Sequence, residues 1–311
     1  MTEAVPAAAR TGRRPRAVDV LRRLPEFLTI WLPLLLSAGH LISFALWTIW
    51  VSFTPSTLVP VSGCVGLRNY TAVMATRNWQ IAFDNLLVFG CGFVLLSVLT
   101  GLVLAILLDQ RIRGENVLRS IFLYPLAVSF VVTGTVWSWL LNPGIGIQKL
   151  VNGLGWTSFR FDWLIDGDMA IWTIVIAAVW QSSGFAMALF LAGLRAVDAD
   201  LVKAAQIDGA GPLRMYRRVI LPTLWPITVT VIVIQLQFAI TTFDLVRALT
   251  GGGPGIATQL PALVVYDFMF QRGQLGRGSA AAVLLLLSLL AVLLPYYAYA
   301  QWRARRDRAN G

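Results

Sequence analysis

The sequence has few of the residues on which enzymes and soluble domains depend. Of its 311 residues only 13% are charged, and it contains one histidine, two cysteines and two lysines. Charge this scarce in a chain that is 57% hydrophobic excludes an ordinary soluble domain. Neither lysine follows a glycine-rich loop of the kind that cradles nucleotide phosphates, so we expect no ATP hydrolysis by this chain itself.

The same scarcity excludes most metal and acid–base chemistry. The one histidine, His40, lies in an apolar run without a neighbouring metal ligand, and the two cysteines are too few for a disulfide framework. Asp162, Asp166 and Asp168 are close in sequence, but their spacing does not fit a calcium-binding EF-hand loop. We therefore predict no catalytic residue, no metal site and no cofactor in this chain.

Long apolar runs are what the sequence has in abundance. Six stretches without charge exceed the roughly 20 residues that an α-helix needs to cross a bilayer. The run 248–266 is also apolar, but its glycines and prolines indicate an outer loop, partly re-entrant, because unpaired backbone cannot face lipid. The fold class predicted is an all-α membrane protein with six transmembrane helices. The spans are expected at about 28–53, 85–108, 120–141, 169–194, 219–243 and 279–302.

The basic residues predict how the spans are oriented. We expect a flexible basic tail at 1–26, a six-helix domain at 27–302 and a second basic tail at 303–311. Together with loops 109–119 and 195–218, the tails hold 18 of the 25 lysines and arginines. Because positive charge gathers on the cytoplasmic side, both termini and the 195–218 loop are predicted to be cytoplasmic. Topology thus accounts for the net charge of +10, and we expect no nucleic-acid partner.

The most informative stretch is polar and lies between two predicted spans. Asp198 suits the N-cap of a short helix, the Asp208-Gly209 pair breaks that helix, and Pro212 suits the first turn of a second one. Small side chains leave a surface that another protein's groove can receive closely. They are Ala204, Ala205, Gly209 and Ala210. The alternative interpretation is an amphipathic linker that lies on the membrane surface.

Residues 203–222, KAAQIDGAGPLRMYRRVILP, resemble the cytoplasmic "EAA" loop of permease subunits from binding-protein-dependent ABC importers. The family pattern is Glu-Ala-Ala, three residues, Gly, nine residues, Ile, one residue and Leu-Pro. Here Lys203 replaces the Glu and Val219 replaces the Ile. The resemblance implies that this loop couples the permease to a separate ATPase. The implied coupling residues are Lys203, Ala204, Ala205, Asp208, Gly209, Ala210, Tyr216, Leu221 and Pro222.

The resemblance covers most of residues 66–290 and is strongest to sugar-importer permeases of the maltose and glycerol-phosphate type. The last part reads closest to glucose/mannose or α-glucoside importers. Matching positions are Asn69-Tyr70, Asn85, Pro125, Ser129, Trp137, Trp139 and Asn142-Pro143. This similarity implies the type I permease fold of ABC importers. It also implies that the chain forms half of the path by which a mono- or oligosaccharide crosses the membrane.

The same resemblance implies a set of partners and a location. A second homologous permease subunit would complete the path, and two ATP-binding subunits would hold ATP and Mg. An extracytoplasmic binding protein would deliver the sugar. The complex would lie among the lipids of a bacterial cell membrane as a multi-pass protein.

Polar side chains within the predicted spans indicate where a solute passes, since a polar group at that depth must face protein or a water-filled cavity. Amides supply donors and acceptors, and aromatic rings stack on sugar rings, so such a lining fits a neutral, hydroxyl-rich solute. The other interpretation is hydrogen bonding between helices. The candidate path residues are Gln181, Ser182, Gln235, Gln237, Phe238, Thr241, Thr242 and Phe243.

Two other functions fit the sequence less well. An ion-coupled secondary transporter of a small neutral solute usually needs ionisable residues in mid-membrane and often an inverted repeat, and the sequence has neither. An intramembrane enzyme needs an acid–base or nucleophile set at membrane depth, which the predicted spans also lack.

Overall fold

The computed structural model describes residues 17–110 and 113–310, and within those ranges all regular structure is helical. The expectation of an all-α protein is therefore confirmed. Two further segments, η1 (Tyr216–Ile220) and η2 (Asp267–Gln271), are single π-helical turns. The α-helices are α1 (Ala17–Ser52), α2 (Arg68–Met74), α3 (Arg77–Asp109), α4 (Glu115–Ala127), α5 (Phe130–Leu140), α6 (Ile147–Gly153), α7 (Ala170–Arg195), α8 (Ala199–Ile207), α9 (Pro212–Met215), α10 (Leu221–Thr223), α11 (Trp225–Thr241), α12 (Asp244–Leu249), α13 (Pro261–Tyr266) and α14 (Leu275–Asn310).

Four of these helices, α1, α3, α7 and α14, are long and apolar enough to cross a membrane. Two sharply bent helix pairs bring the number of spans in the described residues to as many as six, if each pair is one span. Every predicted span overlaps one of these segments. The apolar run 248–266 forms no long helix, because the end of α12, a loop and α13 divide it.

The structure moves the boundary of the first predicted tail and shows the conformation of the second. Helix α1 begins at Ala17, inside the predicted tail 1–26, whose first sixteen residues lie outside the described ranges. Val20, Leu21 and Leu24 continue the helical spacing of the apolar run that follows, which explains the earlier start. At the other end α14 continues through Asn310, so most of the tail predicted at 303–311 is helical.

The two bent pairs are the main departure from straight predicted spans. Helices α4 and α5 meet at 98°, and the segment Leu213–Thr223 meets α11 at 65°. Pro125 lies in the last turn of α4, and Val128, directly after that helix, is extended with ψ of 137°. At the second bend, Pro222 is the second residue of α10 and Pro226 is the second residue of α11. Proline removes a backbone donor and crowds the preceding turn, which is the physical reason for such breaks.

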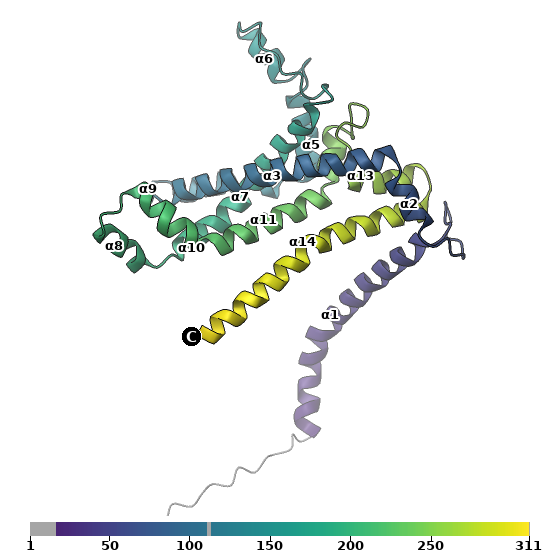
Figure 1. The fold of residues 1–311 in the computed structure, drawn as a ribbon, viewed down its shortest axis with the longest axis horizontal. Helices are drawn as coiled ribbons and strands as arrows, with labels where there is room; N and C mark the ends of the chain where they lie inside the picture. The colour runs from purple at the N-terminus through teal and green to yellow at the C-terminus, as the bar shows by residue number, and fades with distance from the viewer. Residues whose placement is uncertain (1–16, 111–112, 311) are drawn as a thin grey trace, which may run out of the picture. The chain divides into compact units, whose positions relative to one another are not determined.

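Two units make up the described chain, one ending at Trp50 and the other beginning at Val51. In the larger unit α3, α7 and α11 run alongside one another and enclose the core (Figure 1). Small residues allow the close approach, since a Cβ on Gly101 of α3 would crowd Ala186 of α7. A Cβ on Gly184 would overlap the carbonyl oxygen of Phe122 in α4.

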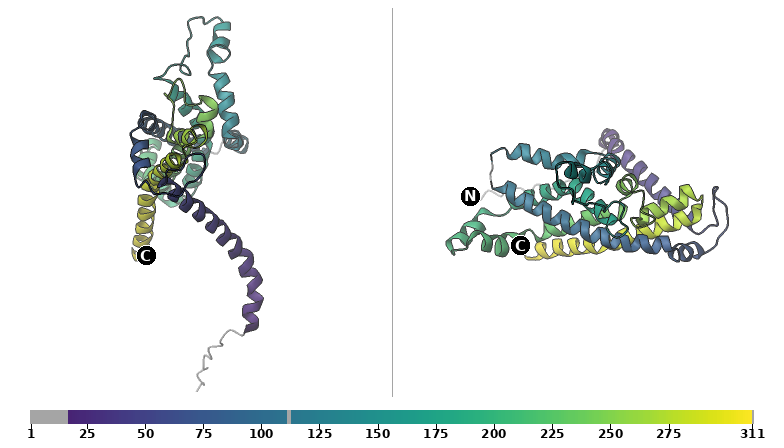
Figure 2. Two further views of the ribbon diagram at one scale, coloured as in Figure 1. Left: turned by 90° about the vertical axis from the view of Figure 1, so that its right-hand side faces the viewer. Right: turned by 90° about the horizontal axis from the view of Figure 1, so that it is seen from above.

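The larger unit has two distinct ends. Helices α8 and α9 lie at one of them, here called the loop end, and α2 and α13 lie at the opposite one, here called the α13 end (Figure 1). Figure 2 shows the same separation from two further sides. Helix α14 starts at the α13 end and runs back toward the loop end, so its last turn and the 195–218 loop lie on the same side of this unit.

Candidate functional site

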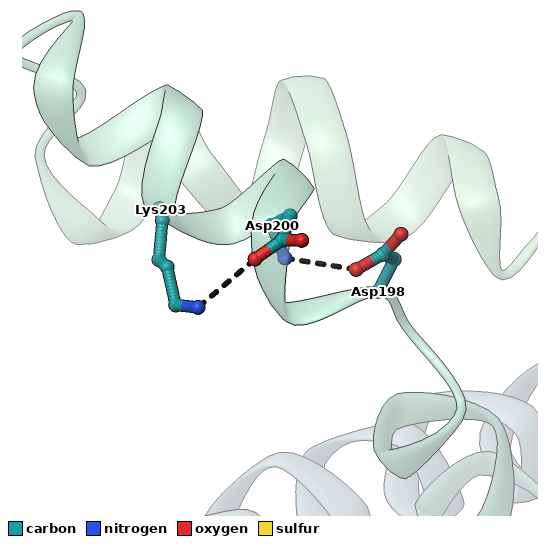
Figure 3. A network of polar contacts seen from close by, with 3 residues as sticks. All are labelled: Asp198, Asp200 and Lys203. Atoms are coloured by element: carbon teal, nitrogen blue, oxygen red, sulfur yellow. Dashed lines mark hydrogen bonds and ion pairs between the residues drawn. The ribbon is translucent and has the colours of Figure 1, made fainter.

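Helix α8 begins as its sequence predicts. The Asp198 side chain accepts a hydrogen bond from the backbone N–H of Asp200, 2.9 Å away, and so satisfies one of the free donors of the first turn (Figure 3). One turn on, Lys203 Nζ donates to Asp200 Oδ1 at 2.9 Å. Both side chains of this ion pair are mostly exposed, so it contributes little stability and leaves Lys203 accessible to a partner.

The end of α8 is also the one predicted. Helix α8 stops at Ile207, and Gly209 takes a φ of +74°, the left-handed conformation that glycine adopts most readily. The backbone N–H groups of Gly209 and Ala210 then donate to Gln206 and Ala205, at 3.1 and 3.0 Å. A Cβ on Gly209 would meet nothing within 4 Å, so backbone conformation, not crowding inside the chain, is what requires glycine here.

The two halves of the loop differ in how they are held. After the turn, η1 and α10 connect the loop to the core, with Ile220 and Leu224 buried in the cluster between α3, α7 and α11. Tyr216 is half-buried and its hydroxyl accepts a 3.4 Å hydrogen bond from Gln110, the residue directly after α3. Helix α8 buries no residue, and large apolar side chains beside the turn are open, with Ile207 86% exposed and Leu213 83% exposed.

The remaining predicted coupling residues divide between the two halves, with Leu221 and Pro222 in α10 and the others in α8 and the turn after it. Ala204, Asp208, Leu221 and Pro222 are exposed, and Ala205 and Ala210 are half-buried. The loop therefore presents an exposed apolar and small-residue face on α8 while its second half is fixed to the bundle. An exposed apolar face of this kind is typical of a surface that another protein covers.

The predicted solute-path residues separate into two groups. In the first, Gln181 and Gln235 are buried, 1% and 0% exposed, together with Ser182. Gln181 Nε2 donates to the Val128 carbonyl, 2.7 Å away, at the α4–α5 bend. Ser182 Oγ lies 3.5 Å from Gln235 Nε2 and 3.4 Å from Ser97 Oγ. These contacts are those of helix-to-helix hydrogen bonding, the second of the two interpretations given by the sequence.

The second group surrounds a hollow of about 180 Å³ at the end of α11. Phe130 and Phe238 are 6.5 Å apart between ring centroids on its wall. Gln237 is exposed on α11 but is not among the residues that line the hollow. The lining consists of Phe130, Phe238, Thr241, Thr242, Phe243, Asp244 and Leu245.

Sequence reasoning missed three lining residues, Phe130, Asp244 and Leu245. Phe130 is more than a hundred positions from the rest, and only the packing of α5 brings it here. Asp244 directly follows the aromatic and hydroxyl run that ends at Phe243, so extending that run by one residue would have included it.

Asn85, one of the positions that carry the resemblance, has a structural role at the α13 end. Its Nδ2 donates to the carbonyl oxygens of Ala257 and Gln259, at 2.9 and 3.0 Å, and so holds the loop before α13 against α3. Gln259 in turn donates to Asp267 Oδ2 at 2.9 Å. Burial raises the pKa of the Asp267 carboxyl, and the nearby charges of Arg272 and Arg247 oppose that rise.

In the described part of the chain no three His, Cys, Asp or Glu side chains gather in a way that holds a metal ion. His40 packs edge to face against Phe44 in α1, with ring centroids 4.5 Å apart. The two features that stand out are the exposed helix of the 195–218 loop and the small hollow at the end of α11.

Residues 97–306 match the family described as binding-protein-dependent transport system inner membrane component. This chain belongs to that family. A family member is the membrane-spanning component of a transporter and not its ATPase, so this chain is a multi-pass membrane transport subunit and not an enzyme.

Individual relatives agree with the family match. The chain is 37% identical to a probable ABC transporter permease protein of Pyrococcus horikoshii, across 88% of this chain and 94% of the relative. It is 33% identical to the trehalose/maltose transport system permease protein of Thermococcus litoralis, across 82% and 86%. In fold it is similar to a chain of a bacterial alginate ABC transporter solved with its periplasmic protein, with TM-score 0.76, 18% identity and coverage of 94% and 98%.

Proposed function

We propose that this chain is the permease subunit of an ATP-driven importer and forms half of the path for a neutral carbohydrate that an extracytoplasmic binding protein delivers. Family membership, together with the relative from Thermococcus litoralis named for trehalose and maltose transport, carries the proposal. A second homologous permease subunit completes the path, and two ATP-binding subunits with ATP and Mg drive it. Surrounding lipids cover the apolar helices.

The coupling loop, residues 195–218, is the part of this chain that contacts the ATP-binding subunit and moves when that subunit changes conformation. Its exposed helix α8, with open Ile207 and Leu213 beside the turn, supports docking in a groove of an ATP-binding subunit. The buried residues Ile220 and Leu224 pass any displacement of the loop directly to α11. Alternating access is then a two-state equilibrium that binding protein and ATP bias through this contact.

The solute path runs along the end of α11. Phe238, Thr241, Thr242 and Phe243 line the hollow, and Gln237 is exposed on the same helix. Ring faces and hydroxyl oxygens suit the faces and hydroxyl groups of a sugar. The buried group formed by Gln181, Ser182 and Gln235 positions the helices behind this path.

The proposed topology has six spans, with both termini and the coupling loop in the cytoplasm. The distribution of 18 of 25 basic residues supports it, as does the return of α14 toward the loop end. Cysteines introduced by Val5→Cys and Arg308→Cys should be labelled only from the cytoplasmic side, and one introduced by Arg160→Cys only from outside. Labelling of position 160 from inside would overturn this orientation.

Uptake into proteoliposomes tests the function itself. The chain, reconstituted with its permease partner and ATP-binding subunits, should accumulate a radiolabelled sugar only when ATP and the binding protein are both present. A panel of trehalose, maltose, xylose and glucose covers the neutral classes. Uptake that needs an ion gradient and no ATP would instead favour an ion-coupled secondary transporter.

A further inference from the structure

The hollow at the end of α11 contains a carboxylate that needs an explanation of its own. Asp244 is the first residue of α12, is exposed, and lines the hollow beside Thr241 and Thr242. Asp244 belongs to neither of the two ion pairs that the structure describes, Arg195 with Glu115 and Lys203 with Asp200. Its negative charge is therefore free to act on whatever enters the hollow.

The next basic residue along the chain does not neutralise it. Arg247 lies over the ring of Tyr266, with its guanidinium carbon 5.3 Å from the ring centroid. Its charge also acts on the carboxyl group of Asp267, which belongs to the π-helical turn η2. Arg247 is thus occupied on the side of α12 that faces Tyr266, and it is not among the lining residues.

The other polar groups of the lining add to the same electrostatic character. The Thr241 hydroxyl donates to the Gln237 carbonyl at 2.9 Å, and the Thr242 hydroxyl donates to the Phe238 carbonyl at 2.6 Å. Because each hydroxyl has one proton, both present lone pairs and not protons to the hollow. The polar side chains of the lining, Thr241, Thr242 and Asp244, therefore all offer negative potential.

We infer that this hollow selects neutral, hydroxyl-rich solutes and rejects anionic sugars such as sugar phosphates and uronates, with Asp244 as the residue that sets this selectivity. The inference rests on the proposed function, in which the hollow is part of the solute path. Sugar hydroxyls donate to the threonine and carboxylate oxygens, whereas a phosphate or carboxylate meets like charge and finds no cationic side chain in the lining.

The local potential can be measured without knowing the transported sugar. In the assembled transporter, with Cys64 and Cys91 replaced by serine because both are exposed, Thr241→Cys places one thiol in the hollow. Its rates of modification by a cationic and by an anionic methanethiosulfonate reagent are compared. The ratio of the two rates cancels any change in thiolate fraction, which affects both reagents equally. Asp244→Asn then removes the charge with almost no change in shape.

We expect the cationic reagent to be favoured, and the ratio to fall on the order of tenfold in Asp244→Asn, since two charges a few ångströms apart in a partly wetted site interact strongly. Asp84→Asn is the matched control, because Asp84 is an exposed carboxylate outside the lining, and it should leave the ratio unchanged. If the thiol reacts but the ratio of its two modification rates is the same with and without Asp244→Asn, the inference is overturned and the placement of the path stands. A thiol that neither reagent reaches, with or without ATP, would overturn the placement of the path as well.

Discussion

In the core, α4 and α7 approach so closely that a Cβ on Gly184 would overlap the Phe122 carbonyl oxygen, whereas in the coupling loop a Cβ on Gly209 would meet nothing within 4 Å. Both positions need glycine, but Gly184 is required by a neighbouring backbone and Gly209 by its own φ of +74°. The core is thus specified by contacts within this chain. The turn at Gly209 is specified by its own backbone conformation, and substitutions in the two regions should differ in which measurement they change.

The largest effect is expected from Gly184→Ala in the core. The added methyl group overlaps a backbone atom that no rotamer change can move, so α4 and α7 must separate. Overpacking of this kind costs about 1–3 kcal/mol or more. Thermal unfolding of the detergent-solubilised chain should show the loss, while Gly153→Ala, at a glycine with open space around it, should leave the unfolding temperature nearly unchanged. Equal stability of the two variants would mean that the helices are not in contact there.

Gly209→Val should abolish ATP-driven uptake and weaken co-purification of the ATP-binding subunit, while the protein still inserts normally. A β-branched residue is strongly disfavoured at this φ, so the turn after α8 would have to rearrange. Gly209→Asn is the control, because asparagine tolerates the left-handed conformation, and it should retain most of the binding. Full uptake by the valine variant would contradict docking of the loop and favour the alternative interpretation, a linker that lies on the membrane surface.

Gln181→Leu tests the buried group. It leaves the Val128 carbonyl at the α4–α5 bend without its donor, which costs about 1–3 kcal/mol when the acceptor stays buried. The unfolding temperature should fall, and uptake per assembled complex should not. A specific loss of uptake at unchanged stability would return Gln181 to the solute path.

Gln237→Leu should behave in the opposite way. Gln237 is exposed at the end of α11, so its loss should leave insertion, assembly and thermal stability intact. A lost hydrogen bond to a solute is worth about 1 kcal/mol, or roughly a fivefold weaker apparent affinity for sugar. Uptake kinetics measure it directly, and normal kinetics for every sugar in the panel would remove this residue from the path.

The smallest effect on the isolated chain is expected from Lys203→Glu, which restores the residue of the family pattern. The pair with Asp200 is exposed and worth about 0–1 kcal/mol, so stability should hardly change. Co-purification of the ATP-binding subunit is the informative measurement. Unchanged binding indicates a peripheral position, and a clear loss indicates an acidic residue opposite Lys203 on the partner.

Local sequence signals predicted the long helices and the two ends of α8. Apolar run length places the long helices, and the N-cap at Asp198 and the break at Gly209 depend only on neighbouring residues. The division of the candidate path residues into a buried group and a group at the hollow was not predictable in this way. Gln181 donates to the carbonyl of Val128 at the α4–α5 bend, a residue 53 positions away in the sequence. Phe130 likewise reaches the hollow only through the packing of α5. Neither contact can be read from neighbouring residues. Periodicity indicates which side chains share a helix face, but not what the other helices place against it.

The bend at Leu224 has a mechanical consequence for transport. Helix α11 continues for 17 residues from the bend to Thr241, which at 1.5 Å per residue is a rigid arm of about 25 Å. Swinging that arm by about 10° about the bend carries its tip through about 4 Å, more than the roughly 2.8 Å diameter of a water molecule. A slight rotation where the loop joins the bundle is therefore enough to admit or exclude water at the hollow.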